Sequence, residues 1–308
     1  MLRTIRHRLE WTGLCLLSAV IGLLPRVSVR RIGRRIGHLA WVLMGYRRNL
    51  AKRNLSRAMP HLANRDVARV VRGVFENLGQ TAVEAVGSGR DGYDDILSRV
   101  DGEGAHWLRD ATDRGDGAIL VTGHFGNWEI ATTAAIAQFP HMRGKFHFVR
   151  RALKPQWLDR LVTHRFNQAR FGVFPKRDSL DAMLERLDQG DVIVFPFDQH
   201  ARPPDGIEVD FFGHPAWTFK SLAIIALATG APVLPAAVWR ESDGRHVLRF
   251  EEALPLIECE NTNEAIRRNT LVHNRALERL VLRHPEQWYW MQRRWKPAAS
   301  RRPPRAKR

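Results

Sequence analysis

The sequence of 308 residues is poor in cysteine and has no repeated unit, and each shortage excludes a class of protein. Its two cysteines, Cys15 and Cys259, are too few for a disulfide framework, and neither stands at metal-ligand spacing to another ligand. We therefore expect a reduced body that faces the cytoplasm. The absence of an internal repeat argues against a solenoid, and the absence of a Gly/Ser-rich linker argues against loosely tethered domains.

Long apolar runs are also scarce. Residues 11–25 carry no charge, but this run falls short of the roughly 20 residues that span a bilayer. Pro25 and the Arg30–Arg35 cluster follow it, where a cleaved signal peptide would have small residues. The segment is either a short spanning helix or a helix that lies in the interface. We expect residues 1–45 to be a retained membrane anchor and residues 46–298 to be the catalytic domain.

Acidic residues are almost missing from both ends of the chain, whose net charge is +17. Residues 1–53 hold twelve Lys/Arg against Glu10 alone, and residues 293–308 hold eight Lys/Arg and no acid, so the middle is nearly neutral. Basic ends suit nucleic acid or an anionic membrane. The apolar run favours the membrane, and no nucleic-acid-binding motif appears, which leaves that function a distant alternative. We expect residues 299–308 to form a disordered basic tail.

Hydrophobic periodicity predicts an α/β fold, with a mostly parallel sheet flanked by helices. Apolar residues three and four apart predict an amphipathic helix over 64–87. Short apolar runs predict strands at 118–122, 146–150, 192–197, 233–238 and 247–250. Helices are expected at about 127–138, 155–170, 179–189, 216–229 and 263–283. In such folds the chemistry gathers at the carboxyl ends of the strands.

The segment Gly-His-Phe-Gly-Asn-Trp-Glu directly follows the run 118–122 and places His124 and Glu129 after a strand. The bracketing glycines permit a tight backbone, and Asn127 is a candidate helix cap. A carboxylate that holds one ring nitrogen prepares the other to remove a proton from an alcohol. We interpret the pair as a catalytic dyad, with direct attack by the acceptor hydroxyl. The alternative is a capping histidine and a solvated acid, and two ligands are too few for zinc.

This segment resembles the His-x4-Asp/Glu motif of the lysophospholipid acyltransferase superfamily, and its Gly-Asn-Trp-Glu form resembles the lipid A late acyltransferases. The likeness extends from about residue 47 to residue 296. It implies a glycerolipid acyltransferase-like fold and assigns the catalytic roles to His124 and Glu129. Gly126 and Asn127, within the motif, are then expected to contact substrate.

Further segments carry the same resemblance. Arg150 matches a family arginine that would bind phosphate, with Arg151 in place of the usual proline, and Asp198 matches a family acid that would line the pocket. The alternatives are a solvated arginine and a structural loop acid. The Phe-Phe-Gly segment before the helix predicted at 216–229 is expected to be a loop that walls an acyl groove, or part of the core. The terminal Trp/Arg block, residues 285–296, fits a membrane interface or stacking on nucleic acid.

The resemblance implies an O-acyltransferase that moves a fatty acyl chain from an acyl carrier protein thioester, or from acyl-CoA, to a hydroxyl of a lipid A precursor-like glycolipid. The alternative acceptors are a lysophospholipid and a phosphatidylinositol mannoside. Backbone N–H groups near residues 123–126, or a nearby arginine, would stabilise the oxyanion. No metal and no cofactor are needed. The expected location is the cell inner membrane, with the catalytic domain facing the cytoplasm.

Overall fold

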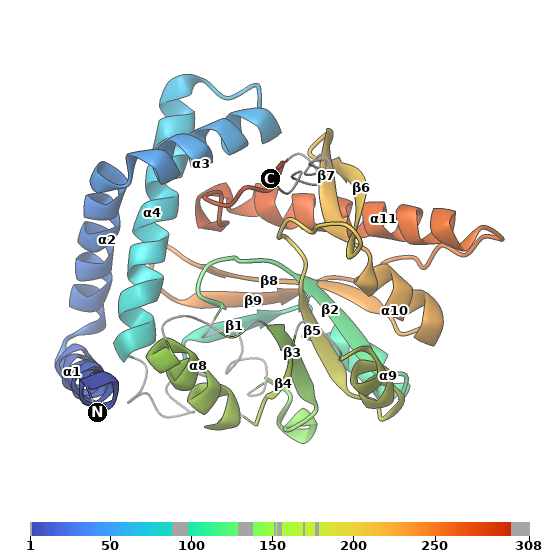
Figure 1. Ribbon diagram of the computed structural model, residues 1–308, viewed down its shortest axis with the longest axis horizontal. Helices are drawn as coiled ribbons and strands as arrows, with labels where there is room; N and C mark the ends of the chain where they lie inside the picture. The colour runs from blue at the N-terminus through green and yellow to red at the C-terminus, as the bar shows by residue number, and fades with distance from the viewer. Residues whose placement is uncertain are drawn as a thin grey trace, which may run out of the picture.

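A computed structural model describes residues 2–87, 98–128, 138–150, 152, 156–168, 170–175 and 179–296. The centre of the molecule is a twisted seven-stranded sheet in the order β1-β9-β8-β2-β5-β3-β4 (Figure 1). Its strands are β1 (Val100–Glu103), β2 (Ala118–Thr122), β3 (Phe146–Arg150), β4 (Gly172–Pro175), β5 (Val192–Pro196), β8 (Val233–Arg240) and β9 (His246–Phe250). All neighbouring strands are parallel except β8 and β9. The predicted α/β class is confirmed.

The sheet is covered on both faces, because the side chains of each central strand alternate between two cores. In β2, Ile119 and Val121 belong to one core, and Ala118 and Leu120 belong to the other. The first core includes residues of α4 (Asn64–Gly87), α9 (Leu180–Asp188), α10 (Ser221–Thr229) and α11 (Thr262–Arg283). The second includes residues of α6 (Ala105–Asp113) and α8 (Gln156–Gln168). Strands covered on both faces are apolar throughout, which explains the unbroken apolar run of β2.

The predicted helix at 216–229 is wrong in its first part. Residues 214–219 form β7 (His214–Phe219), which pairs in antiparallel fashion with β6 (Gly206–Phe211), and the helix α10 begins at Ser221. The Phe-Phe-Gly segment is therefore the turn of a hairpin rather than a loop before a helix. Phe212 and Gly213 both have positive φ, 53° and 72°, as the tightest two-residue turns between twisted strands require. Only Lys220 and Ser221 separate the apolar residues of the strand from those of the helix, and this closeness misled the prediction.

The N-terminal part consists of α1 (Leu2–Leu23), α2 (Arg26–Leu43) and α3 (Gly45–Ala58), followed by α4. Helix α2 lies along α4 (Figure 1). Glycines allow the two backbones to touch, since a Cβ on Gly33 would stand 2.5 Å from Cα of Gln80 in α4. Gly37 and Gly79 meet the opposite helix equally closely. Helix α4 has the bounds that the periodicity predicts.

Among the helices that the structure describes, none combines the length and the apolar character needed to cross a bilayer. Helices α1 and α2 make up most of the predicted anchor over residues 1–45, and its membrane role stays a prediction. Residues 129–137, which hold most of the helix predicted at 127–138, lie outside the described residues, and so do residues 299–308 of the predicted tail.

Candidate active site

The candidate active site lies where β2 and β5 end, because these adjacent parallel strands deliver His124 and Asp198 to the same edge of the sheet. Nδ1 of His124 lies 2.8 Å from Oδ1 of Asp198. The backbone N–H of His124 donates to Oδ2 of the same carboxylate at 2.8 Å, and the indole N–H of Trp288 donates to Oδ2 at 2.9 Å. Both carboxylate oxygens of Asp198 are therefore occupied, and the loop after β5 is held in place.

The electrostatics of this pair favour an ionised acid beside a basic imidazole. Burial raises the pKa of the fully buried Asp198 carboxyl, but the charge of His124 and the hydrogen bonds from His124 and Trp288 outweigh burial and lower that pKa. Burial likewise lowers the pKa of His124, and the charge and hydrogen bond of Asp198 outweigh it and raise that pKa. An ionised carboxylate accepts the proton on Nδ1. Nε2 is thereby left as the proton acceptor, on a side chain that is 29% exposed.

Two glycines shape the loop that carries His124, as the sequence predicts. Gly126 has a φ of 45°, and a Cβ at this position would stand 2.5 Å from the carbonyl oxygen of Val238. A Cβ on Gly123 would stand 3.0 Å from Oδ2 of Asp198. The loop also pairs with the C-terminal segment, since the N–H of Gly126 donates to Gln287 and the N–H of Tyr289 donates to His124. The imidazole is thus mounted on a backbone that is fixed from two sides.

Of the residues predicted for the site, the structure brings His124 and Asp198 into direct contact. Asp198 was predicted from the resemblance as a substrate contact. The structure adds that it binds His124, where it can orient the imidazole. The spacing of residues along the sequence did not indicate this contact. A signal was present in the sequence, because His124 comes two positions after the predicted strand 118–122 and Asp198 comes directly after the predicted strand 192–197. Glu129, the predicted partner of His124, lies outside the described residues.

Asn127 is fully buried and faces a second cluster of polar side chains. Its amide donates to Oε2 of Glu84 in α4 at 2.9 Å. The same carboxylate binds the guanidinium of Arg240, and Arg240 also donates to Oδ1 of Asn77 at 2.5 Å. His246 lies beside this cluster, and burial lowers its pKa to about 4. Sequence reasoning missed Glu84 and Arg240, which lie 156 positions apart in the chain.

Arg150 ends β3, on the far side of β5 from β2. Its guanidinium donates to Oδ1 of Asp159 at 2.7 Å and to the hydroxyl of Thr163 at 2.6 Å, both in α8. The guanidinium is therefore held by the helix that flanks this end of the sheet. Its predicted contact with phosphate stays a prediction, as do the substrate contacts of Gly126 and Asn127.

The interpretation of the terminal Trp/Arg block as a membrane or nucleic-acid surface is wrong for three of its residues. Trp288, Trp290 and Arg294 are at most 1% exposed, and they pack in the core. The guanidinium of Arg294 donates to the carbonyl of Trp217 at 2.8 Å and to the hydroxyl of Thr218 at 2.7 Å. Burial lowers the pKa of Arg294 to about 10. The block therefore closes the core under the β6–β7 hairpin and positions Asp198 through Trp288.

The side chains around Nε2 of His124 are aromatic and amide groups. The Trp128 ring stands edge-on to the imidazole with centroids 5.7 Å apart, and the Tyr289 ring lies at 6.4 Å. The amide nitrogen of Gln199 lies 3.4 Å from Nε2 of His124. Among the described residues, no group of three His, Cys, Asp or Glu side chains is placed to hold a metal ion.

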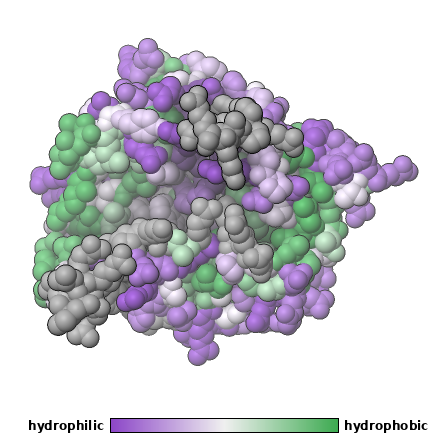
Figure 2. Space-filling view, in the orientation of Figure 1, coloured by the Kyte–Doolittle hydropathy of each residue, from purple (hydrophilic) through white to green (hydrophobic). Residues whose placement is uncertain are grey.

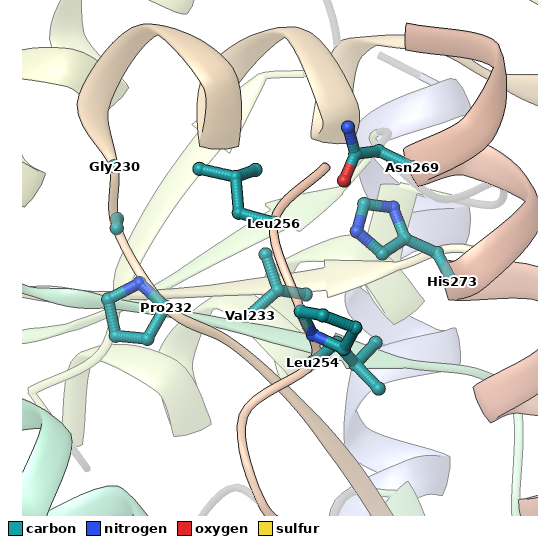
Figure 3. Close-up of a pocket in the computed structure, with 9 residues that line it drawn as sticks. Gly230, Pro232, Val233, Leu254, Leu256, Asn269 and His273 are labelled. Atoms are coloured by element: carbon teal, nitrogen blue, oxygen red, sulfur yellow. The ribbon is translucent and has the colours of Figure 1, made fainter. Parts of the chain in front are cut away.

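A separate cavity of about 190 Å³ lies between the start of β8 and α11 (Figure 3). Val233, which lines it, pairs with Ile119 near the beginning of the parallel strand β2, so this cavity is at the opposite edge of the sheet from His124. Burial lowers the pKa of its His273 to about 3, which keeps the ring neutral. The amide of Asn269, also in the wall, is bonded to the backbone of Ile257. The cavity therefore takes no part in the His124 site.

Comparison with known proteins indicates the family of the chain. The family model described as bacterial lipid A biosynthesis acyltransferase matches residues 1–297. The lipid A biosynthesis lauroyltransferase of Escherichia coli (strain K12) is 26% identical over 297 residues, which cover 94% of this chain and 92% of that protein. A phosphatidylinositol mannoside acyltransferase of Mycobacterium tuberculosis (strain CDC 1551 / Oshkosh) is 30% identical over 204 residues, which cover 65% of this chain and 60% of that protein.

Proposed function

The chain belongs to the bacterial lipid A biosynthesis acyltransferase family, and on that premise we propose that it transfers a fatty acyl chain from an acyl carrier protein thioester to a hydroxyl of a lipid A precursor-like glycolipid. It is an O-acyltransferase, and the single observation that carries the mechanism is the contact of His124 with Asp198. A histidine whose Nδ1 proton is accepted by a buried carboxylate is prepared to remove the proton of an alcohol with Nε2.

In the proposed reaction, Nε2 of His124 removes the proton of the acceptor hydroxyl while the hydroxyl oxygen attacks the thioester carbonyl. Asp198 fixes the ring and stabilises the imidazolium that forms, because its charge lies 2.8 Å from Nδ1. Collapse of the tetrahedral intermediate breaks the C–S bond, and the imidazolium returns the proton to the leaving thiolate. The products are the acylated glycolipid and the free thiol.

The assignment of Glu129 as the residue that orients His124 stays a prediction, because Glu129 lies outside the described residues. The hydrogen bond between Nδ1 and Asp198 favours Asp198 for the orienting role. A Glu129→Gln variant separates the two assignments. If Glu129 orients His124, this variant changes the pH dependence of transfer as Asp198→Asn does, and if it contacts substrate, it changes KM alone.

We also propose that the protein works at the inner membrane, with its catalytic part facing the cytoplasm and with α1 and α2 lying in the interface. Figure 2 shows hydrophobic residues gathered along the side of the molecule that α2 forms. Leu39, Val42 and Leu43 are 50–72% exposed on α2, and the arginines Arg31 and Arg35 are exposed on the same helix. Apolar side chains that enter the headgroup region, with guanidinium groups beside lipid phosphates, are typical of interfacial helices.

A phosphatidylinositol mannoside is the second candidate acceptor, because the relative named for that activity is 30% identical over the matched region. Both acceptors are glycolipids, and the proposed removal of a hydroxyl proton by His124 is the same for both. The alternative of a lysophospholipid acceptor has no named relative among those compared above.

The test is transfer by purified full-length protein from acyl-carrier-protein and CoA thioesters of lauroyl and palmitoyl chains. The acceptors, presented in mixed micelles, are a lipid A precursor, a phosphatidylinositol mannoside and a lysophospholipid, and mass spectrometry reads the products. We expect an added ester on the lipid A precursor that is absent with His124→Ala. Ester formation on the lysophospholipid alone, or equal transfer by His124→Ala, would contradict the proposal.

A further inference from the structure

Among the side chains that surround His124, Gln199 lies nearest to Nε2, the atom that accepts the proton. It directly follows Asp198, whose carboxylate is fixed by His124 and Trp288, so the backbone that carries Gln199 is also fixed. Its amide nitrogen lies 3.4 Å from Nε2 of His124, and its side chain is exposed on the open side of the site. Gln199 therefore stands beside the point where the acceptor hydroxyl must lose its proton.

Three of the backbone donors expected from the sequence, the N–H groups of residues 124–126, are already used. The N–H of His124 donates to Asp198, the N–H of Phe125 donates to the carbonyl of Gly123, and the N–H of Gly126 donates to the carbonyl of Gln287. Each of these bonds helps to shape the loop that holds the imidazole. Breaking one to stabilise an oxyanion would disturb the base itself, which favours a donor outside these three groups.

Resting on the proposed acyl transfer, we propose that the side-chain amide of Gln199 donates the hydrogen bond that stabilises the oxyanion of the tetrahedral intermediate. As the acceptor oxygen bonds to the thioester carbon, the electron pair of the C=O double bond moves onto the carbonyl oxygen. The N–H of Gln199 binds this negative oxygen. When the C–S bond breaks, the pair returns to form the ester carbonyl, and the hydrogen bond weakens again.

Binding of the acceptor releases the donor before the chemical step. In the free protein the neutral imidazole has one lone pair on Nε2, and the amide of Gln199 lies 3.4 Å from it. The acceptor hydroxyl must take this lone pair before it can lose its proton, so it displaces the amide. The amide N–H is then free beside the carbonyl oxygen on which the negative charge forms. A donor placed in advance for a developing charge acts mainly on the transition state.

The test measures two reactions of the full-length protein: transfer to the glycolipid, and slow hydrolysis of the thioester without acceptor, in which water replaces the hydroxyl. Both reactions form an oxyanion, but only the first needs the acceptor. For Gln199→Ala we expect kcat to fall about 10²–10³-fold in both reactions with KM of the thioester unchanged, as for loss of one oxyanion donor. Gln199→Glu should be slower still, because its carboxylate opposes the oxyanion.

Gln189→Ala is the matched control, since Gln189 is exposed at the end of α9 and its side chain bonds Arg186 and Glu185 of that helix. It should keep the wild-type kcat in both reactions. A Gln199→Ala enzyme with kcat within threefold of wild type, or a loss confined to KM of the glycolipid, would overturn the inference. Failure of the proposed function has a different signature: the wild type would not acylate the glycolipid, while thioester hydrolysis would still respond to Gln199→Ala.

Discussion

Asp198 is buried and Glu84 is nearly buried, and both carboxylates support the loop that carries His124, but only Asp198 leaves its partner open to a substrate. Asp198 holds His124, whose ring is 29% exposed and keeps Nε2 toward the open side. Glu84 holds Asn127 and Arg240, and every partner in that cluster is buried or nearly so. The acid nearby raises the pKa of His124, whereas burial lowers the pKa of His246 beside Glu84 to about 4. One cluster is arranged to exchange a proton, and the other is arranged to hold the loop.

The largest effect should come from removing the base. For His124→Ala we expect kcat/KM of acyl transfer to fall about 10³–10⁴-fold, the contribution of a positioned general base. The free energy of unfolding should fall by about 1–3 kcal/mol, because Oδ1 of the buried Asp198 loses its partner while Oδ2 keeps its bonds from the backbone N–H of residue 124 and from Trp288. Steady-state transfer assays and chemical denaturation check both parts. A loss below tenfold would contradict the assignment of the base.

The next effect comes from the orienting acid. Asp198→Asn should lower kcat/KM about 10²–10³-fold and move its acid limb to lower pH. The acid limb depends on the pKa of His124, because only the neutral imidazole accepts a proton. The wild-type rate therefore rises with pH through a pKa above 6.5. Without the Asp198 charge, burial is left and lowers that pKa. A pH–rate profile measures the limb, and an unmoved limb would contradict the electrostatic role of Asp198.

Breaking the second cluster should act on stability instead of chemistry. Arg240→Met leaves Glu84 as a buried carboxylate without its cation, which costs about 3 kcal/mol of unfolding free energy. The acid limb of the pH–rate profile should remain in place. Glu84→Gln combined with Arg240→Met should recover part of the loss, since the double variant buries no unpaired charge. Urea denaturation of the three proteins tests this, and an unaltered stability of Arg240→Met would show that the cluster does not hold the loop.

The smallest effect concerns His246. Its folded pKa of about 4 lies below its ordinary value of 6.5, so the unfolded chain binds the extra proton first as the pH falls. Stability is therefore lost below about pH 6.5, and between pH 7 and pH 5 this residue should account for about 2 kcal/mol. His246→Gln should show a correspondingly flatter decrease in unfolding free energy over this range. An identical decrease in both proteins would contradict the prediction.

The sequence predicts the parts of this molecule that depend on local pattern. The strands β2 and β3 and the helix α4 have the predicted bounds, because buried parallel strands and an amphipathic helix leave clear periodicities. The catalytic edge followed from the rule for parallel sheets. The contact of His124 with Asp198 did not, since it depends on β2 and β5 being neighbours, which no local pattern encodes. The burial of Trp288 and Arg294 was missed for the same reason: composition cannot tell a membrane-facing aromatic from one under a hairpin.

Helix α4 connects the N-terminal helices rigidly to the loop that carries His124. Near its middle it is locked to α2 through the glycine contacts, and further along Thr81 donates to the carbonyl of Gly126 at 3.1 Å while Glu84 accepts from Asn127. With α2 lying in the membrane interface as proposed, α4 sets the distance of Nε2 of His124 from the lipid surface. The enzyme would then select acceptor hydroxyl groups by their depth in the membrane. It would acylate those at one level of the headgroup layer and leave those above or below that level unmodified.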